Sequence, residues 1–143
     1  NSRLDSIQAG VLNAKLPLLD AYGKARQDAA RKYSAAFEGH KNIIAPSICD
    51  ICDCHVFHQY TLRIIDADRN GLMEHLLAKG IPCAIYYPIP LHSQKAYADA
   101  RYKEEDFPVT NQLVKEVISL PMHTELDDEQ IKFITDSVLE FLS

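Results

Sequence analysis

Hydrophobic residues recur with helical spacing at the start of the chain. The first set is Leu4, Ile7, Val11 and Ala14. Positions three or four residues apart share one face of a helix, so this set predicts an opening helix. Pro17 interrupts the pattern and suits the first turn of a second helix, where its missing N–H is not needed. We expect the second helix to end near Gly39, with an apolar face of Leu18, Tyr22, Ala25, Ala29, Tyr33 and Phe37.

The middle of the chain changes to the two-residue alternation that is typical of strands. Residues 56–64 predict a first strand, and the positions on one of its faces are Val56, His58, Tyr60, Leu62 and Ile64. Residues 82–90, PCAIYYPIP, predict a second strand that ends at Pro88 and Pro90, because proline cannot donate to a ladder. A third, short strand is expected at residues 118–120.

Further helices are predicted beside these strands. Residues 68–81 form one, and Gly80 is expected to take the left-handed conformation after its last turn. Residues 109–120 predict a helix that leads into the third strand. The last helix has an N-cap at Asp127, answered three residues later by Gln130 in a capping box. Its buried stripe should be Ile131, Ile134, Val138 and Phe141.

This order of elements predicts an α+β fold. We expect long N-terminal helices, and further helices packed on a small, mainly antiparallel three-stranded sheet. With 143 residues and no internal linker or repeat, residues 1–143 are interpreted as a single domain. The opening NSRLDSIQAGVL lacks a starting Met, which suggests a piece of a longer protein.

The charge balance argues against two classes of partner. Acidic residues outnumber basic ones, 20 to 15, and no basic stripe is present. Because phosphate backbones require clustered Lys and Arg, we expect no nucleic acid and no membrane among the partners. No apolar run approaches the roughly 20 residues of a membrane span. With no export signal, the four cysteines are interpreted as reduced thiols in the cytoplasm.

A cluster of potential metal ligands raises a separate question. It consists of Cys49, Cys52, Cys54, His55 and His58. The spacing of the first two cysteines is that of half a zinc knuckle, but a structural zinc site draws its second ligand pair from a distant turn. We therefore interpret the segment as a surface loop that its aspartates keep solvated, with metal binding as the alternative.

Four phrases in one order resemble a known family. They are NSRLDSIQAGVL, HVFHQYTLRI, KGIPCAIYYPIPLHSQKAY and FPVTNQLVKEVISLPMHTELDDEQI. Together they resemble the C-terminal, small-domain portion of the DegT/DnrJ/EryC1/StrS family of nucleotide-sugar aminotransferases, which depend on pyridoxal phosphate. The resemblance implies that the larger, cofactor-binding domain is absent from this chain.

The resemblance also implies what the intact protein does. Such an enzyme moves an amino group, with glutamate as the expected donor, onto a nucleotide-linked keto-sugar in cell-surface polysaccharide or amino-sugar biosynthesis. The family's Schiff-base Lys lies in a Ser-x-His-x-x-Lys context that this chain lacks, so no catalytic residue is expected here and the chain alone should be inactive. A cytoplasmic homodimer is expected, and some members were first named pleiotropic regulators.

The resemblance assigns roles to six residues. Asn1 and Arg3 match a phrase that binds the cofactor phosphate of the neighbouring subunit, which suits an amide and a guanidinium. The substrate-binding candidates are His58, Tyr60, Tyr86 and His92. Many relatives have His at the position of Tyr86, which puts that contact in doubt. The plain alternatives are a frayed helix start, a core histidine at His58 and a proline-rich surface turn.

A second hypothesis comes from a different class of protein. The chain could be a stand-alone, non-catalytic binding, dimerisation or regulatory module that holds metal through Cys49, Cys52 and Cys54. Zinc analysis of the purified chain, with Cys52→Ser as the variant, separates the two hypotheses.

Overall fold

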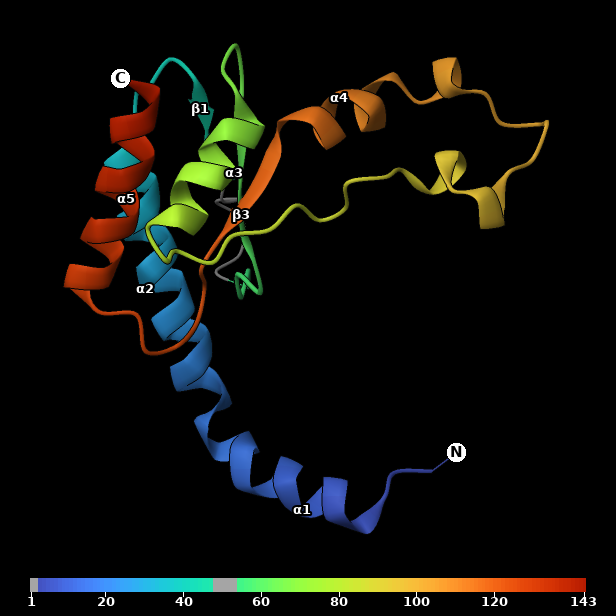
Figure 1. Cartoon of the computed structure of the whole chain (residues 1–143). Coiled ribbons are helices and arrows are strands. Elements are labelled where there is room, and N and C mark those ends of the chain that lie inside the picture. The colour runs from blue at the N-terminus through green and yellow to red at the C-terminus, as the bar shows by residue number, and fades with distance from the viewer. Residues whose placement is uncertain (1–2, 48–53) are drawn as a thin grey trace.

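The computed structural model describes residues 3–47 and 54–143. The chain opens with α1 (Ser6–Lys15), a 3₁₀ turn η1 (Leu16–Leu18) and α2 (Leu19–Phe37). The carboxylate of Asp5 caps α1 by accepting a hydrogen bond from the backbone N–H of Ile7 at 2.7 Å. Pro17 lies in the 3₁₀ turn, where the chain bends between the two helices (Figure 1). The two predicted helices are thus confirmed, and the 3₁₀ turn forms a bend between them.

The described residues form a three-stranded sheet in the order β1-β2-β3. β1 (Ile43–Ile44) and β3 (Val117–Leu120) both pair antiparallel with the central β2 (Tyr60–Ile64). Tyr60 lies opposite Leu120, and Leu62 lies opposite Ile118. Because side chains alternate along a strand, this register places Tyr60, Leu62 and Ile64 together on the buried face.

Helix α3 (Arg69–Ala78) ends as its sequence predicts. Gly80 has φ +75°, and its N–H donates to the carbonyl of Leu77 at 3.0 Å. The N–H of Ile81 reaches back to the carbonyl of Leu76 at 2.9 Å, which completes a Schellman motif. Ile81 is buried, so the motif also anchors the chain that leaves the helix.

The C-terminal helices are α4 (Pro108–Glu116), which runs into β3, and α5 (Asp128–Leu142). Asp127 and Gln130 form the predicted capping box, with bonds of 2.7 and 3.1 Å between side chain and backbone. Along α5, Ile131, Ile134 and Val138 are buried, and Phe141 packs against the core at its edge. The predicted stripe is therefore confirmed.

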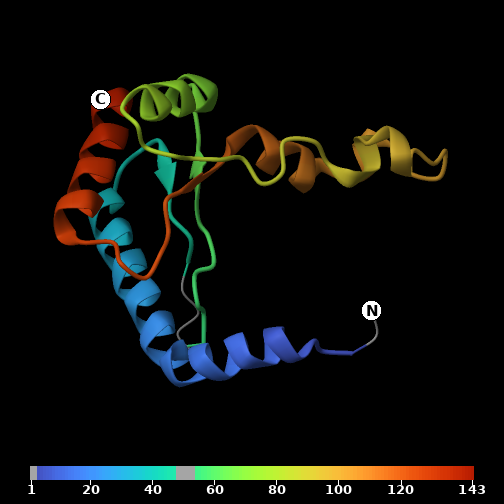
Figure 2. The same cartoon turned by 60° about the horizontal axis from the view of Figure 1, so that its bottom comes forward.

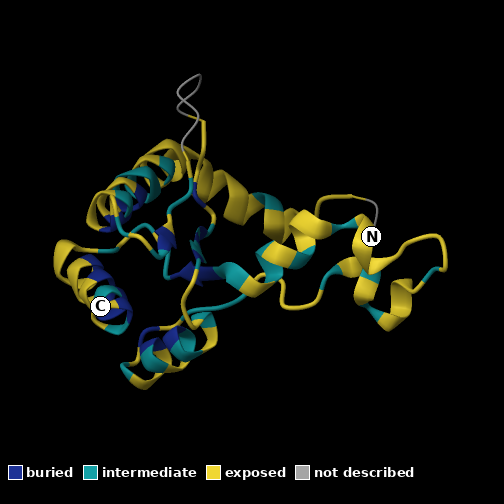
Figure 3. Cartoon of the chain, turned by 90° about the horizontal axis from the view of Figure 1, so that it is seen from above, coloured by how far each residue is buried: buried dark blue, intermediate teal, exposed yellow. Residues whose placement is uncertain are grey.

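Helices α2, α3 and α5 pack on the buried side of the sheet, and α5 contacts both of the others (Figure 3). The buried apolar side chains lie between the helices and the sheet; the largest of those fully enclosed are Tyr33, Tyr60, Leu62, Ile64, Leu72, Leu76, Ile118 and Val138. We call this part, residues 20–84 and 117–143 as far as they are described, the body. It confirms the predicted α+β class.

Two segments extend from the body in the same direction (Figures 1 and 2). One is the N-terminal segment of α1 and η1. The other, which we call the arm, comprises residues 85–116: an extended stretch with the 3₁₀ turns η2 (Leu91–Ser93), η3 (Lys95–Tyr97) and η4 (Glu104–Asp106), and α4. Neither α1 nor α4, both fully described, contains a buried residue.

Two strand predictions were wrong in part. Residues 82–90 contribute only a bridge, in which Ala84 and Ser119 exchange backbone hydrogen bonds of 3.2 and 2.8 Å. The sheet gains its remaining strand from β1, which the sequence did not predict because its two residues are too few to show an alternating pattern. The first strand begins at Tyr60 rather than Val56, because Phe57 takes a left-handed conformation, φ +45°, and turns its ring into the core.

Candidate functional site

Prolines and local hydrogen bonds shape the arm. Pro88 and Pro90 prevent it from continuing as a strand, and η2 begins directly after Pro90. The N–H of Ser93 donates to the carbonyl of Pro90 at 3.0 Å, and the side-chain amide of Gln94 donates to the carbonyl of Ile89 at 3.3 Å. The arm therefore keeps a defined path outside the body.

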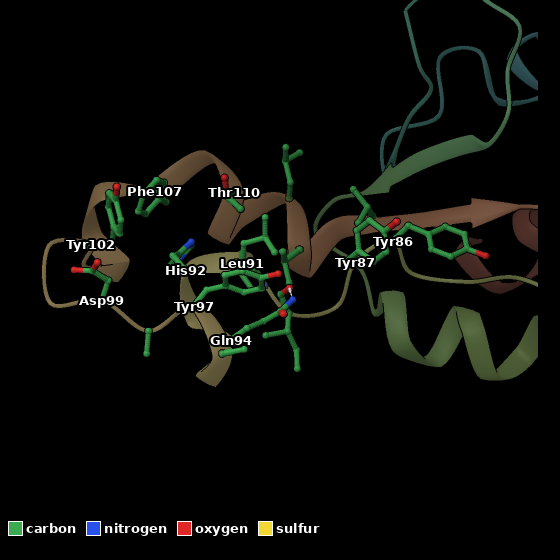
Figure 4. A pocket seen from close by; sticks show the side chains of 17 residues that line it. Tyr86, Tyr87, Leu91, His92, Gln94, Tyr97, Asp99, Tyr102, Phe107 and Thr110 are labelled. Atoms are coloured by element: carbon green, nitrogen blue, oxygen red, sulfur yellow. Dashed lines mark hydrogen bonds between the residues drawn. The ribbon is translucent and has the colours of Figure 1, made fainter. Parts of the chain in front are cut away.

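The arm folds back on itself and encloses a hollow of about 1120 Å³, which we call the arm pocket (Figure 4). Aromatic and aliphatic side chains dominate its lining; the aromatic ones, besides His92, are Tyr86, Tyr87, Tyr97, Tyr102 and Phe107. No Lys or Arg is among the described residues that line it. Such a surface suits the faces of rings and offers no cation for a phosphate.

His92 holds the two sides of the arm together. Its imidazole stacks on the ring of Phe107, with centroids 4.4 Å apart and planes inclined by 17°. Its Nε2 atom is shielded from solvent and has no hydrogen-bond partner in the described part of the chain. An unsatisfied polar atom in the wall of a pocket is costly, and a hydrogen-bonding group on a ligand would offset that cost.

An ion pair closes the far end of the arm. The carboxylate of Asp99 accepts hydrogen bonds from the guanidinium of Arg101, at 2.7 Å from Nη2, and from the Arg101 backbone N–H at 2.9 Å. These bonds lower the pKa of Asp99 below its ordinary value. The guanidinium carbon of Arg101 lies 5.5 Å from the ring centroid of Tyr102. The single acidic group of the lining is thus already paired.

The structure separates the predicted substrate-binding residues. Tyr86 and His92 both line the arm pocket. His58 is exposed and lines a second hollow beside α1 and α2, so the interpretation as a core histidine was wrong. Tyr60 is fully buried, and its hydroxyl lies 2.9 Å from that of Ser34. Tyr60 therefore packs in the core, where no ligand-facing surface is present in the described structure.

The predicted cofactor-binding residues lie at the start of the chain. Arg3 is exposed just before α1, and Asn1 lies outside the described residues. A guanidinium at this position suits a phosphate oxygen.

The cysteine segment is described in part. Cys49 and Cys52 lie outside the described residues. Cys54 is disulfide-bonded, so the expectation of reduced thiols was wrong at this position, whereas Cys83 is a free thiol. The Nδ1 atom of His55 accepts the backbone N–H of Phe57 at 3.0 Å. The described residues contain no group of side chains that could hold a metal ion.

Several residues of the two hollows were missed by sequence reasoning. Tyr97, Tyr102 and Phe107 alternate with turn residues in the stretch QKAYADARYKEEDF, and this recurrence of aromatics outside any strand or helix is a signal that could have found them. Arg26, which lines the second hollow, gave no such signal, because its side chain binds the carbonyls of the distant residues Phe57 and Met122.

The described helices include none that is long and apolar enough to cross a bilayer. Chemically, the arm pocket can bind rings and offer hydrogen bonds from tyrosine hydroxyls, His92 and Gln94. The geometry therefore suits the binding of a ring-bearing ligand.

The chain is similar to known proteins of one family. The DegT/DnrJ/EryC1/StrS aminotransferase family matches residues 1–139. A pleiotropic regulatory protein of Geobacillus stearothermophilus is 38% identical over 143 residues, which cover 99% of this chain and 38% of that protein. A dTDP-3-amino-3,6-dideoxy-alpha-D-galactopyranose transaminase of Aneurinibacillus thermoaerophilus is 35% identical, with 96% of this chain and 36% of that protein covered.

Solved structures give the same result. The chain superimposes on DesV of S. venezuelae, solved in complex with a ketimine intermediate, with a TM-score of 0.88 and 34% identity; 98% of this chain and 37% of that one are covered. An aminotransferase from Brucella abortus gives a TM-score of 0.88 at 34% identity, with 97% of this chain and 36% of that one covered. The chain thus spans well under half the length of these relatives.

Proposed function

The chain belongs to the DegT/DnrJ/EryC1/StrS aminotransferase family, and from this premise we propose that it is the small C-terminal domain of a nucleotide-sugar aminotransferase. The intact protein would transfer an amino group, with glutamate as the donor, to a nucleotide-linked keto-sugar. The observation that carries the proposal is the family match over nearly the whole chain, combined with coverage of only 36–38% of the relatives.

Pyridoxal phosphate would be the cofactor of the intact protein. When bound, it supplies the electron sink for amino-group transfer. In a homodimer, Arg3, together with Asn1, would help to bind the cofactor phosphate in the neighbouring subunit.

The arm would supply the wall that contacts the sugar nucleotide. Its aromatic surface suits a sugar ring or a base, and Nε2 of His92 offers an unsatisfied hydrogen-bonding atom. Tyr86 exposes 47% of its surface and lines the same pocket, so its hydroxyl is available to the substrate. His58 lies in the other hollow, so we assign the main substrate contacts to Tyr86 and His92.

The N-terminal segment would pack against the remainder of the protein. Its exposed side chains outside the second hollow include Leu4, Ile7 and Val11, each with at least 51% of its surface exposed. An apolar row of this kind on a helix indicates a covered surface. Because the chain spans only 36–38% of these relatives, the larger domain of the intact protein, or its copy in a homodimer, would be the partner.

The test is a substrate assay on the natural-length gene product with glutamate and a panel of nucleotide-linked keto-sugars. We expect amino transfer to at least one of them. His92→Gln should raise the KM for the sugar nucleotide roughly tenfold, about the loss of one hydrogen bond, with a smaller change in kcat. His123→Gln, at an exposed position outside the arm pocket, is the matched control. Absence of transfer, or equal KM values for both variants, would contradict the proposal.

A further inference from the structure

We propose that a second hollow, at the bend between α1 and α2, binds a small organic phosphate with an apolar body. This hollow has a volume of about 1090 Å³. Residues of α1, η1 and α2 line it, together with the segment before β2 and Thr124. It shares no lining residue with the arm pocket, and the proposal does not depend on the function assigned above.

The charge of this hollow is opposite to that of the chain. Its described lining holds four cationic side chains, Lys15, Lys24, Arg26 and Arg31, and one acidic side chain, Asp20. The whole chain has a formal net charge of −5. A concave surface lined by one sign of charge concentrates counter-ions of the other sign. The hollow therefore attracts anions although the protein as a whole does not.

Within the described residues, three of the four cations have no carboxylate partner. Arg31 is paired with Asp28, whereas the described ion pairs include none that involves Lys15, Lys24 or Arg26. Both lysines are exposed, so their ammonium groups can adjust to a ligand. Their charges remain available to a phosphate, which can accept hydrogen bonds from several donors at once.

In the described structure, the hydrogen bonds of the Arg26 side chain all go to main-chain carbonyls. Its Nη1 lies 3.3 Å from the carbonyl oxygen of Phe57, 3.4 Å from that of His58 and 3.3 Å from that of Met122. These carbonyls belong to the neighbouring segments that precede β2 and follow β3, and together they hold the partly buried guanidinium in place. No hydrogen bond of its Nε or Nη2 is found in the described structure. A fixed guanidinium with free donors is the arrangement that recognises phosphate oxygens.

The remaining lining is apolar. Leu12, Leu16 and Leu19 expose 53%, 65% and 60% of their surfaces, and Val56 exposes 57%. The ring of Tyr22 lines the same hollow. A ligand that carries only charge would leave these side chains in contact with water, whereas one with an apolar body would bury them. This combination specifies an organic phosphate rather than free phosphate.

Calorimetric titration of the natural-length gene product tests the site. The protein is saturated with pyridoxal phosphate and desalted, and phenyl phosphate is the probe. We expect saturable binding that weakens as NaCl is raised, because the attraction is screened. Inorganic phosphate should bind about tenfold more weakly, since it lacks the apolar body. Benzoate, which carries the ring on a carboxylate, should also bind more weakly than phenyl phosphate.

Substitutions locate the binding. Lys15→Gln with Lys24→Gln, both at exposed positions, should weaken phenyl phosphate binding about tenfold or more. Arg26→Gln should weaken it at least as much, and the lysine variant keeps the test valid if Arg26→Gln misfolds. Lys41→Gln with Lys115→Gln removes the same charge outside the hollow and should change the affinity less than about twofold. Absence of saturable binding, or equal loss in the two double variants, would overturn the proposal.

Discussion

The body and the two projecting segments differ in where they place their apolar side chains. In the body, apolar residues from α2, α3, α5 and the sheet are buried against one another. In the N-terminal segment and the arm, large apolar residues stay exposed; examples are Ile7 at 79%, Leu91 at 67% and Tyr87 at 74%. The body therefore buries its apolar side chains within itself, whereas the exposed apolar side chains of the two projecting segments are suited to contact with another molecule or domain.

This difference separates the part of the chain that stabilises the fold from the parts that are available for binding and assembly. Burial in the body supplies the free energy of folding, and loss of a contact there should reduce stability. The projections gain little from folding by themselves, so substitutions there should alter binding and assembly. Three pairs of measurements test this difference. Two of them compare a residue of the body with a residue of a projecting segment, and the third compares one residue of the body at two pH values.

The largest difference in stability between the body and the arm is expected when a leucine is replaced by alanine. Leu62→Ala, at a fully buried position of β2, should lower the free energy of unfolding by about 2–5 kcal/mol, because it removes buried methyl groups and leaves a cavity. Leu91→Ala in the arm should change it by less than about 0.5 kcal/mol. Urea denaturation of the 143-residue chain measures both. Similar losses would show that the arm is part of the core.

A smaller difference is expected for the two helix caps. Asp127→Ala removes the capping box of α5, which carries buried residues, and should cost about 0.5–2 kcal/mol of global stability. Asp5→Ala removes the equivalent cap of α1, which buries none of its residues. It should increase hydrogen exchange in α1 without shifting the urea midpoint. A shift of the midpoint by Asp5→Ala would argue that α1 folds together with the body.

The smallest effect concerns pH and the buried Tyr33. Its hydroxyl donates to the carbonyl of Pro121 at 3.0 Å, and burial raises its pKa above the ordinary value. The folded state therefore holds this proton more tightly than the unfolded state, and the resulting stability is lost as the pH rises above about 10. Tyr33→Phe should cost about 1 kcal/mol at pH 7.

Above pH 10 the unfolded wild-type chain gains stability by ionising this tyrosine, which the phenylalanine variant cannot do. The difference between wild type and Tyr33→Phe should therefore shrink from pH 7 to pH 10.5, as measured by urea midpoints at both values. A constant difference would show that the ionisation of Tyr33 is not linked to folding.

The sequence predicted the body better than the arm, for physical reasons. The cap at Asp127, the left-handed Gly80 and the stripe of α5 depend on residues close together in the chain, and all are confirmed. The strand at residues 82–90 failed because strand pairing depends on a distant partner, and only Ala84 finds one. The start of β2 shifted because Phe57 adopts a conformation that few residues other than glycine take.

The candidate site was predictable only in outline. The phrase YPIPLHSQ indicated a ligand-binding loop, and Tyr86 and His92 do line one pocket. Alternation also suggested that His58 and Tyr60 lie on the same face of one strand, but the turn at Phe57 separates an exposed imidazole from a buried phenol. No local pattern could show that Arg26 joins segments before β2 and after β3.

The central claim is that this chain is the non-catalytic small domain of an aminotransferase. The most direct test is the visible absorption spectrum of the natural-length gene product, purified with pyridoxal phosphate, recorded before and after glutamate is added beside the 143-residue chain treated in the same way. We expect the natural product to bind the cofactor and glutamate to convert it to the pyridoxamine form, whereas the 143-residue chain should show neither change. A natural product without bound cofactor, or a 143-residue chain that converts it unaided, would contradict the claim.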